Sequence, residues 1–324
     1  MRALVLDGIP RVATDIEEPA RAPGEALIAV RVAGICDTDL QLARGYMGFR
    51  GVPGHEMVGE VVTADDVRWI GRRVVADINA GCGACDDCRT RGRPPGHHCP
   101  KRTVLGILGR SGAFAERLTI PERCLVEVPD GLDDDRAVFA EPLAAALHVL
   151  DDLDAGASGA SAQRVMVLGD GKLGLLIAFA VAASGARVTV VGHHRSKLAI
   201  AAAAGIDTVL ESELDGRGVT DVVVEATGTA GGLARALELV RPRGTIILKS
   251  TVASPITVDL APAIVHEIRL IGSRCGDMRA AIDALAAQRV DPRPLIAARY
   301  PLARADEALA YAGTRGVMKV LLDA

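Results

Sequence analysis

Hydrophobic positions along the chain follow two contrasting patterns. Up to about residue 130, short runs of β-branched residues are broken by glycine and proline. The predicted strands are 25–34, 55–64, 72–78, 115–120 and 124–129. Many short strands with turn residues between them predict a compact β domain, such as a partly open barrel. From Ala137 the pattern becomes helical, and a Gly/Ser/Ala-rich stretch at 154–163 predicts a surface loop.

After this stretch, strand and helix patterns alternate. The predicted strands are 164–169, 186–192, 220–228, 244–250 and 268–273, and the predicted helices are 172–185, 196–205 and 231–241. We expect Ser196 to cap the second helix and Gly205 to end it. Near-continuous apolar strands that alternate with helices predict an α/β fold with a doubly wound parallel sheet, covered on both faces.

The last 45 or so residues do not repeat this unit. They predict helices at 278–288 and 304–313 and a strand at 318–323. A chain of 324 residues exceeds the usual size of a single core, so two domains are expected. We place the first at 1–142 and the second at 143–275, and we expect 276–324 to return to the first.

Composition narrows the class of protein. The net charge is −4 and the basic residues are spread along the chain, so nothing indicates a nucleic-acid partner. The first residues lack the apolar segment of a signal peptide, and no later apolar run stays uncharged for about 18 residues. These features predict a cytoplasmic protein without a membrane partner. Its 7 cysteines are then expected to be thiols or metal ligands.

The stretch GDGKLG fits the pattern G-x-G-x-x-G, with Lys172 and Leu173 between its last two glycines. The pattern is weak alone, but here it joins a buried strand to a helix. Gly169 allows the tight turn, Gly171 lets the backbone approach a pyrophosphate, and Gly174 allows close packing of helix and strand. We interpret it as a dinucleotide site; the alternative is an ordinary turn.

A ribose-binding acid is expected about 20 residues further on. The chain instead has a basic run there, made up of His193, His194, Arg195 and Lys197. Cations at the start of a helix oppose its dipole, and the 2′-phosphate of NADP would balance them. We therefore predict that the catalytic efficiency with NADP is roughly ten- to a hundredfold higher than with NAD. This preference should shrink as the histidines lose their protons. The alternative is that the run is a solvated basic loop, which would leave NAD as the cofactor.

Four cysteines lie close together in the sequence at Cys82, Cys85, Cys88 and Cys99. Four thiolates at this spacing predict a structural zinc, which has no open position for a substrate. His97 or His98 could replace one thiolate, and a redox cysteine cluster is the alternative.

A second group of potential ligands is spread more widely. Cys36, Thr38 and Asp39 lie in GICDTDL, His55 and Glu56 in GVPGHEMVGEV, and Glu141 in FAEPLAAALH. Singly, each has an ordinary structural explanation. Together they offer the sulfur, nitrogen and oxygen donors of a catalytic zinc with an open position.

These motifs, in this order, resemble the zinc-dependent medium-chain alcohol dehydrogenases, particularly the threonine and polyol dehydrogenases, over nearly the whole chain. The resemblance implies a GroES-like β-barrel catalytic domain with both zincs and a Rossmann domain for the nicotinamide cofactor. It also implies that Cys36 and His55 bind the catalytic zinc, with Glu56 or Glu141 as the remaining ligand. Asp39 would then orient His55, and Thr38 would accept the proton of the alcohol.

Three positions depart from the family pattern. Asp37 stands where a small or basic residue is usual, and Gln41 replaces the histidine that often completes the proton relay. The gap before Cys99 is longer than usual, which makes its assignment the least secure of the four.

The sequence thus predicts an oxidoreductase that transfers a hydride between a secondary alcohol or polyol and a nicotinamide cofactor, in the cleft between the domains. The substrate would be a small alcohol or carbonyl compound, and the enzyme a homodimer or homotetramer. The alternative is a non-catalytic zinc-binding or regulatory protein of the same fold. The intact set of ligands argues against it, and also against a zinc-free quinone reductase.

Overall fold

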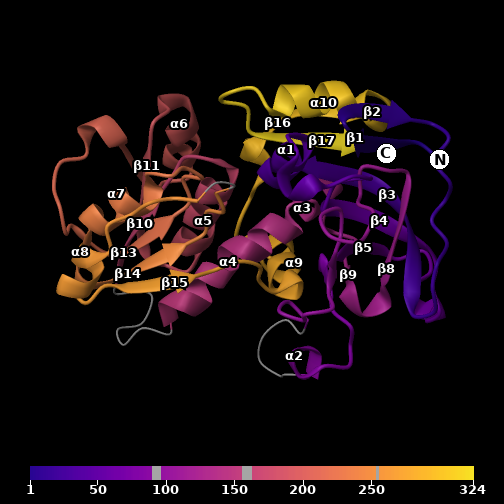
Figure 1. The fold of residues 1–324 in the computed structure, drawn as a ribbon, viewed down its shortest axis with the longest axis horizontal. Helices are drawn as coiled ribbons and strands as arrows, with labels where there is room; N and C mark the ends of the chain where they lie inside the picture. The colour runs from indigo at the N-terminus through magenta and orange to yellow at the C-terminus, as the bar shows by residue number, and fades with distance from the viewer. Residues whose placement is uncertain (90–95, 155–162, 253–254) are drawn as a thin grey trace. The chain divides into compact units, whose positions relative to one another are not determined.

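The chain divides into two compact units. The structure, a computed structural model, describes residues 1–89, 96–154, 163–252 and 255–324. One unit consists of Met1–Glu141 together with Gly276–Ala324, and the other of Pro142–Cys275 (Figure 1). Most of the loop predicted at 154–163 lies outside the described residues.

The first unit contains a largely antiparallel sheet in the order β16-β17-β3-β4-β5-β9, with β8 also paired to β3. Its strands are β3 (Glu25–Ile35), β4 (Glu56–Thr63), β5 (Arg73–Ala76), β8 (Arg117–Pro121), β9 (Leu125–Glu127), β16 (Ile296–Pro301) and β17 (Lys319–Asp323). Two smaller pairs are β1 (Ala3–Asp7) with β2 (Ile9–Ala13), and β6 (Asn79–Ala80) with β7 (Thr103–Val104). Because β17 pairs antiparallel with β3, the end of the chain is part of this sheet.

The first unit also contains several short helices. They are α1 (Asp37–Ala43), α2 (Asp86–Arg89), α3 (Asp134–Ala137), α9 (Met278–Ala286) and α10 (Ala305–Ala312). Single 3₁₀ turns lie at Tyr46–Gly48, Val67–Trp69, Glu122–Cys124, Arg293–Leu295 and Leu302–Arg304. Phe114 and Phe139 are the largest fully buried side chains of the core.

The second unit is a six-stranded, wholly parallel sheet in the order β12-β11-β10-β13-β14-β15. The strands are β10 (Arg164–Leu168), β11 (Arg187–Gly192), β12 (Asp207–Leu210), β13 (Thr220–Glu225), β14 (Val240–Leu248) and β15 (Arg269–Gly272). Its helices are α5 (Lys172–Ala183), α6 (Arg195–Ala203), α7 (Gly232–Leu239) and α8 (Ala261–Val265), with a 3₁₀ turn at Glu211–Glu213. The predicted doubly wound α/β fold is confirmed.

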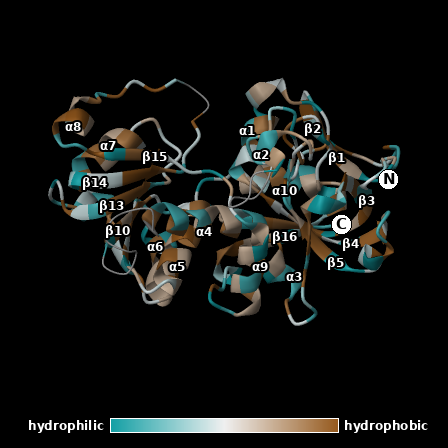
Figure 2. Cartoon of the chain, turned by 90° about the horizontal axis from the view of Figure 1, so that it is seen from below, coloured by the Kyte–Doolittle hydropathy of each residue, from teal (hydrophilic) through white to brown (hydrophobic). Residues whose placement is uncertain are grey.

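Helix α5 is apolar on most of its surface, as Figure 2 illustrates. The side chains from Leu175 to Val181 are buried, because this helix packs against β10 and β11. Helix α4 (Ala140–Asp154) runs from the end of the first unit into the second. Among the described helices, none has the length and apolar character that a membrane span requires.

Several predicted element boundaries were wrong. The helix predicted from Ala137 begins at Ala140 as α4, because Ala137 is the last residue of a separate short helix, α3. Strand β14 begins at Val240, inside the predicted helix 231–241, because Val240 pairs with Thr220 of β13. Strands β12 and β16 were not predicted; both lie at sheet edges, where the apolar pattern is weaker. Ser196 does not cap α6, whose N-cap is His194.

Candidate functional site

Cys36, His55 and Glu56 come together at one end of the antiparallel sheet. Cys36 follows β3 and is the N-cap of α1, while His55 and Glu56 lie at the start of β4. Since β3 and β4 pair with Gly34 opposite Glu56, the two segments are neighbours. One potential ligand atom from each of the three residues lies within 4.8 Å of the others. Such a sulfur, nitrogen and oxygen set suits a divalent metal ion.

Asp39 links the two segments that carry these side chains. It is fully buried, and its Oδ2 accepts a hydrogen bond from the backbone N–H of Cys36 at 2.8 Å. Its Oδ1 accepts one from Gly54 N–H at 3.1 Å and lies 3.3 Å from His55 Nδ1. Burial lowers the pKa of His55, but Asp39 and Cys36 outweigh it and raise that pKa well above its ordinary value. The site therefore has the negative potential that favours a cation.

Glu56 is held by a lysine from the far end of the chain. Lys319 of β17 donates a hydrogen bond to Glu56 Oε2, and both residues are buried. Burial lowers the pKa of Lys319, yet Glu56 and Cys36 raise it overall, so the ammonium stays charged. The other oxygen, Oε1, is buried without a hydrogen-bond partner. An unpaired buried carboxylate oxygen is costly, and a metal ion would satisfy it.

Glu141 is near this group but not part of it. It lies at the start of α4 and is not among the three residues whose ligand atoms lie together. Burial raises the pKa of Glu141 to about 6, an effect that His55 and Lys319 oppose and Glu56 reinforces. Of the two carboxylates proposed for the remaining ligand position, only Glu56 has an oxygen next to Cys36 and His55.

Thr38 lies in the first turn of α1, beside this group. Its Oγ1 is 4.0 Å from Cys36 Sγ. Gln41 is one turn further along the same helix. A hydroxyl at this position can exchange a proton with a group bound between the three ligand atoms.

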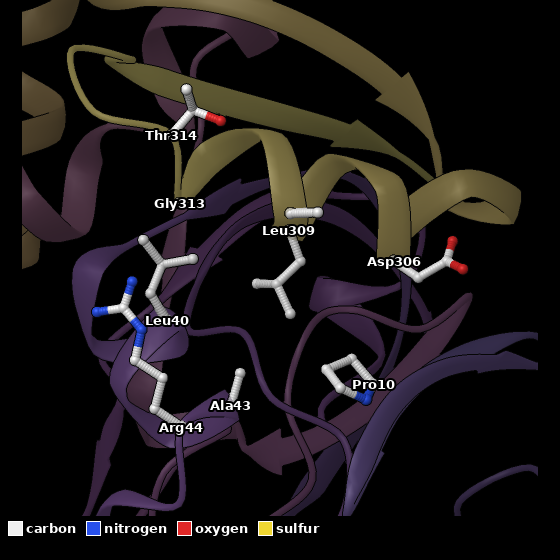
Figure 3. A pocket seen from close by; sticks show the side chains of 9 residues that line it. Pro10, Leu40, Ala43, Arg44, Asp306, Leu309, Gly313 and Thr314 are labelled. Carbon is white, nitrogen blue, oxygen red and sulfur yellow. The ribbon is translucent and has the colours of Figure 1, made fainter.

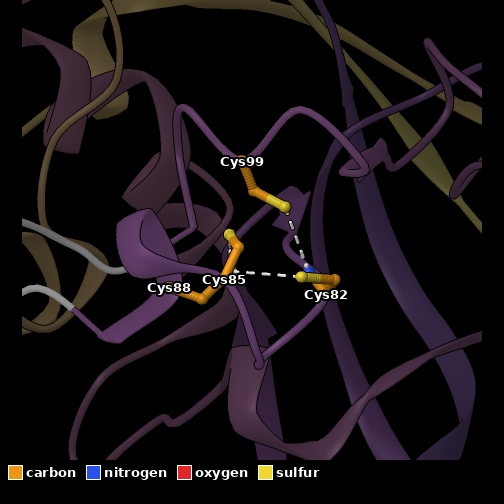
Figure 4. Close-up of side chains that lie close together, drawn as sticks. All are labelled: Cys82, Cys85, Cys88 and Cys99. Carbon is orange, nitrogen blue, oxygen red and sulfur yellow. Dashed lines mark hydrogen bonds between the residues drawn. The ribbon is translucent and has the colours of Figure 1, made fainter.

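The four cysteines form a second, separate cluster (Figure 4). Their sulfur atoms all lie within 4.8 Å of one another, with 3.5 Å between Cys85 Sγ and Cys88 Sγ and 4.0 Å between Cys82 Sγ and Cys88 Sγ. Tetrahedral zinc with bonds of about 2.3 Å places sulfur atoms at comparable separations. Cys99 belongs to the cluster despite the long gap before it, part of which lies outside the described residues.

Local hydrogen bonds favour the thiolate form of Cys82, whereas burial and the neighbouring cysteines raise the pKa of the Cys85 thiol to about 12. The backbone N–H groups of Ala84 and Cys85 lower the pKa of the Cys82 thiol to about 6. His97, an alternative ligand, has its Nε2 2.7 Å from Asp77 Oδ2 instead. None of the 7 cysteines forms a disulfide. The geometry therefore favours four sulfur ligands over a set that includes a histidine.

The glycine turn has the close packing that its sequence predicts. Gly169 has a φ of +127°, and a Cβ there would come within 2.5 Å of the Ala226 carbonyl oxygen. A Cβ at Gly174 would collide with the carbonyl oxygen of Gly169. Gly171, the N-cap of α5, has open space in front of it, and Lys172 and Leu173 form the first turn of the helix. A phosphate can therefore approach the backbone at this helix N-terminus.

The basic run after β11 differs from its sequence interpretation in one respect. We predicted that no carboxylate stands at the end of this strand, but the side chain of Asp170 reaches it from the glycine turn. The backbone N–H groups of His193 and His194 donate to Asp170 Oδ2 at 2.8 and 2.7 Å. These bonds hold the segment before α6, whose N-cap His194 makes no side-chain cap hydrogen bond. The sequence signal that could have revealed it is an acid inside the glycine turn combined with Gly192 at the strand end.

The cations of this run have acidic neighbours. His194 Nδ1 lies 3.0 Å from Asp170 Oδ2, and Arg195 donates to Glu213 at 2.5 Å. His193 is exposed and Lys197 half-buried. The positive charge that suggested a 2′-phosphate is thus partly neutralised.

A pocket of about 420 Å³ lies between α1, α10 and β2 (Figure 3). Leu40 and Leu309 form its apolar walls, while Arg44 and Asp306 lie at its rim. Its lining includes none of the potential metal ligands described above.

Comparisons with known proteins agree along most of the chain. Residues 22–130 match the alcohol dehydrogenase GroES-like domain, and residues 173–290 match the zinc-binding dehydrogenase domain. An erythritol/L-threitol dehydrogenase of Mycolicibacterium smegmatis is 33% identical over 76% of this chain and 74% of its own length. A 2-dehydro-3-deoxy-L-galactonate 5-dehydrogenase of Pseudoalteromonas atlantica is 30% identical over 95% of this chain and 94% of its own.

Solved structures share the fold over the full length. A putative zinc-binding dehydrogenase from Sinorhizobium meliloti, bound to NADP, is similar with a TM-score of 0.87 and 28% identity, over 100% of this chain and 99% of its own. An alcohol dehydrogenase from a Thermus species has a TM-score of 0.88 and 28% identity over the same shares.

Proposed function

This chain belongs to the zinc-dependent medium-chain alcohol dehydrogenases, and we propose that it oxidises a secondary alcohol or polyol at the group formed by Cys36, His55 and Glu56. The observation that carries this proposal is the unpaired, buried Glu56 Oε1 beside a cysteine and a histidine. These three residues would hold the catalytic zinc. Glu141 would stay outside its ligand set.

Each residue of the proposed site has a distinct role. Bound zinc would polarise the alcohol oxygen, and the nicotinamide would accept the hydride. Thr38 Oγ1 would accept the alcohol proton while its own hydroxyl proton passes on to water. Asp39 is a positioning residue, because one carboxylate fixes Cys36, the loop at Gly54 and the ring of His55. Gln41 can pass hydrogen bonds onward but does not titrate, so the proton would leave through water beyond Thr38.

A second zinc would be held by Cys82, Cys85, Cys88 and Cys99. Four sulfur ligands fill a tetrahedral site, so this ion would stabilise its loop and take no part in the reaction. Support comes from the sulfur separations and from the backbone N–H groups around Cys82. We propose two zincs per chain on this basis.

The cofactor would be a nicotinamide dinucleotide bound at the glycine turn. Gly169, Gly171 and Gly174 leave the backbone open for a pyrophosphate at the start of α5. The preference for NADP over NAD is the prediction of the sequence alone. It rests on His193, His194, Arg195 and Lys197, and the carboxylates of Asp170 and Glu213 oppose it.

The substrate class follows from the relatives. Those named above act, by their names, on erythritol or threitol and on a sugar-acid derivative. We propose a small polyol or hydroxy acid for this chain. The test is a panel of alcohols, polyols and sugar acids with NAD and NADP, monitored by the absorbance of the reduced cofactor. Full zinc occupancy without turnover on any compound would favour a non-catalytic member of the fold.

We also propose that the chain forms a homodimer or homotetramer. Among the described strands, β15 pairs only with β14, so its outer edge is open for another strand. At the end of α8, Ile264 is 78% exposed and Val265 is 72% exposed. Two adjacent apolar side chains with this exposure indicate an interaction surface. A second copy of the same edge would cover both features through a two-fold axis.

A further inference from the structure

The glycine pattern G-x-G-x-x-G does not specify which residue stands at position 170, where this chain has an aspartate. Asp170 is the second residue of the glycine turn between β10 and α5, yet its side chain points sideways to the end of β11. Its Oδ2 accepts two backbone hydrogen bonds, from His193 and His194, and the side chain is almost fully buried. Asp170 therefore holds the segment between β11 and α6.

Gly192 is matched to this carboxylate. A Cβ at Gly192 would come within 2.5 Å of both Asp170 Cβ and Oδ2. Gly192 is the last residue of β11, where dinucleotide-binding sheets of this kind usually carry their ribose-binding acid. An acid side chain cannot stand there while Asp170 fills the same space. The carboxylate of Asp170, supplied from the neighbouring turn, thus takes the place of the acid that usually stands at the strand end.

The replacement has a consequence for cofactor choice. A 2′-phosphate needs hydrogen-bond donors and positive charge at this strand end. Asp170 uses the N–H groups of His193 and His194, and it pairs with the ring of His194. A phosphate would have to displace these bonds or lie beside the negative charge of the carboxylate. Both alternatives weaken its binding.

We propose that Asp170 is a specificity-determining residue that discriminates against the 2′-phosphate of NADP by occupying the donors at the end of β11. This inference rests on the proposed nicotinamide cofactor. It assigns to the glycine turn a second role besides binding the pyrophosphate. It also explains why a basic run can follow the strand without making a strong phosphate site.

The test measures binding of NAD and NADP to the zinc-loaded enzyme by calorimetry. Asp170→Asn keeps the shape and an acceptor but removes the charge, and Asp170→Ser also vacates space. Both should raise the affinity for NADP relative to NAD roughly ten- to a hundredfold, the size of one charge-assisted contact. Asp207→Asn is the matched control, because it removes an exposed charge at the opposite end of the parallel strands.

Three outcomes separate the inference from the function beneath it. A ratio that stays within about twofold in folded Asp170→Asn or Asp170→Ser overturns the inference, as does an equal change in Asp207→Asn. If neither variant folds, the affinities of the wild type for adenosine 2′,5′-bisphosphate and for 5′-AMP are compared. Binding of the bisphosphate that is more than about tenfold tighter than that of 5′-AMP overturns the inference, and a difference of less than about threefold supports it. Failure of the wild type to bind NAD or NADP at all contradicts the proposed function instead.

Discussion

Lys319 of β17 and Glu56 of β4 form a buried ion pair, although the two residues are 263 positions apart in the sequence. Their side chains are 2% and 1% exposed, so neither charge is solvated by water. Lys319 also contacts the carbonyl oxygen of Ile35, next to Cys36. The last strand of the chain thereby fixes a carboxylate of the proposed catalytic site.

Removing Lys319 should be strongly destabilising. In the zinc-free protein, Lys319→Met leaves Glu56 as an uncompensated buried charge, which typically costs about 3–5 kcal/mol. We expect a clear fall in the urea midpoint of unfolding. Arg304→Met is the control, because Arg304 pairs with Glu307 at the surface and should change the midpoint little. Equal effects of the two substitutions would show that burial does not set the strength of the pair.

Loss of one cysteine of the four-sulfur cluster should empty a zinc site without directly removing catalysis. Cys85→Ser should release one zinc per chain and lower the melting temperature, because metal binding and local folding are coupled. Turnover should fall only as the fold is lost. Metal analysis by mass spectrometry checks this, with Cys124→Ser as the control, since Cys124 is a buried thiol outside both ligand groups. A well-folded Cys85→Ser protein with two zincs would contradict the assignment.

Substitutions at the proposed catalytic zinc site should remove turnover directly while cofactor binding is kept. Cys36→Ser and His55→Ala should each lose one zinc and nearly all turnover, because the metal supplies the Lewis acid. NAD binding should persist, since the glycine turn lies in a different unit. The measurements are zinc content, turnover and calorimetric NAD binding. Full zinc occupancy with turnover within a few-fold of wild type would falsify the catalytic assignment.

The apolar edge around α8 should mediate self-association. Ile264→Glu combined with Val265→Glu should reduce the oligomer to smaller species, because two desolvated carboxylates oppose burial of the surface. Light scattering coupled to size exclusion measures the mass. Ile9→Glu is the control, because Ile9 is 82% exposed in the other unit. The proposal fails if the double variant keeps the wild-type mass.

Sequence patterns predicted the fold better than its local boundaries. Apolar strands such as 164–169 were recognisable because both faces are buried, whereas β12 and β16 lie at sheet edges with a weak pattern. The ligand motifs were visible as short segments, because His55 and Glu56 are adjacent in sequence. Lys319 and Asp170 were missed, since their roles depend on long-range pairing of β17 with β3 and of β10 with β11.

The last prediction distinguishes the two carboxylates proposed for the catalytic zinc. Glu56→Gln alone would leave Lys319 as an unpaired buried charge, so a loss of zinc could reflect damage to the fold. The double variant Glu56→Gln/Lys319→Met keeps the interior neutral and still removes the anionic oxygen next to Cys36 and His55.

We expect this double variant to lose about one zinc per chain while Lys319→Met alone and Glu141→Gln keep both, as measured by metal analysis after dialysis. Glu141 should be dispensable because it is not among the residues whose ligand atoms lie together. Zinc lost from Glu141→Gln but retained by the double variant would assign the third ligand to Glu141.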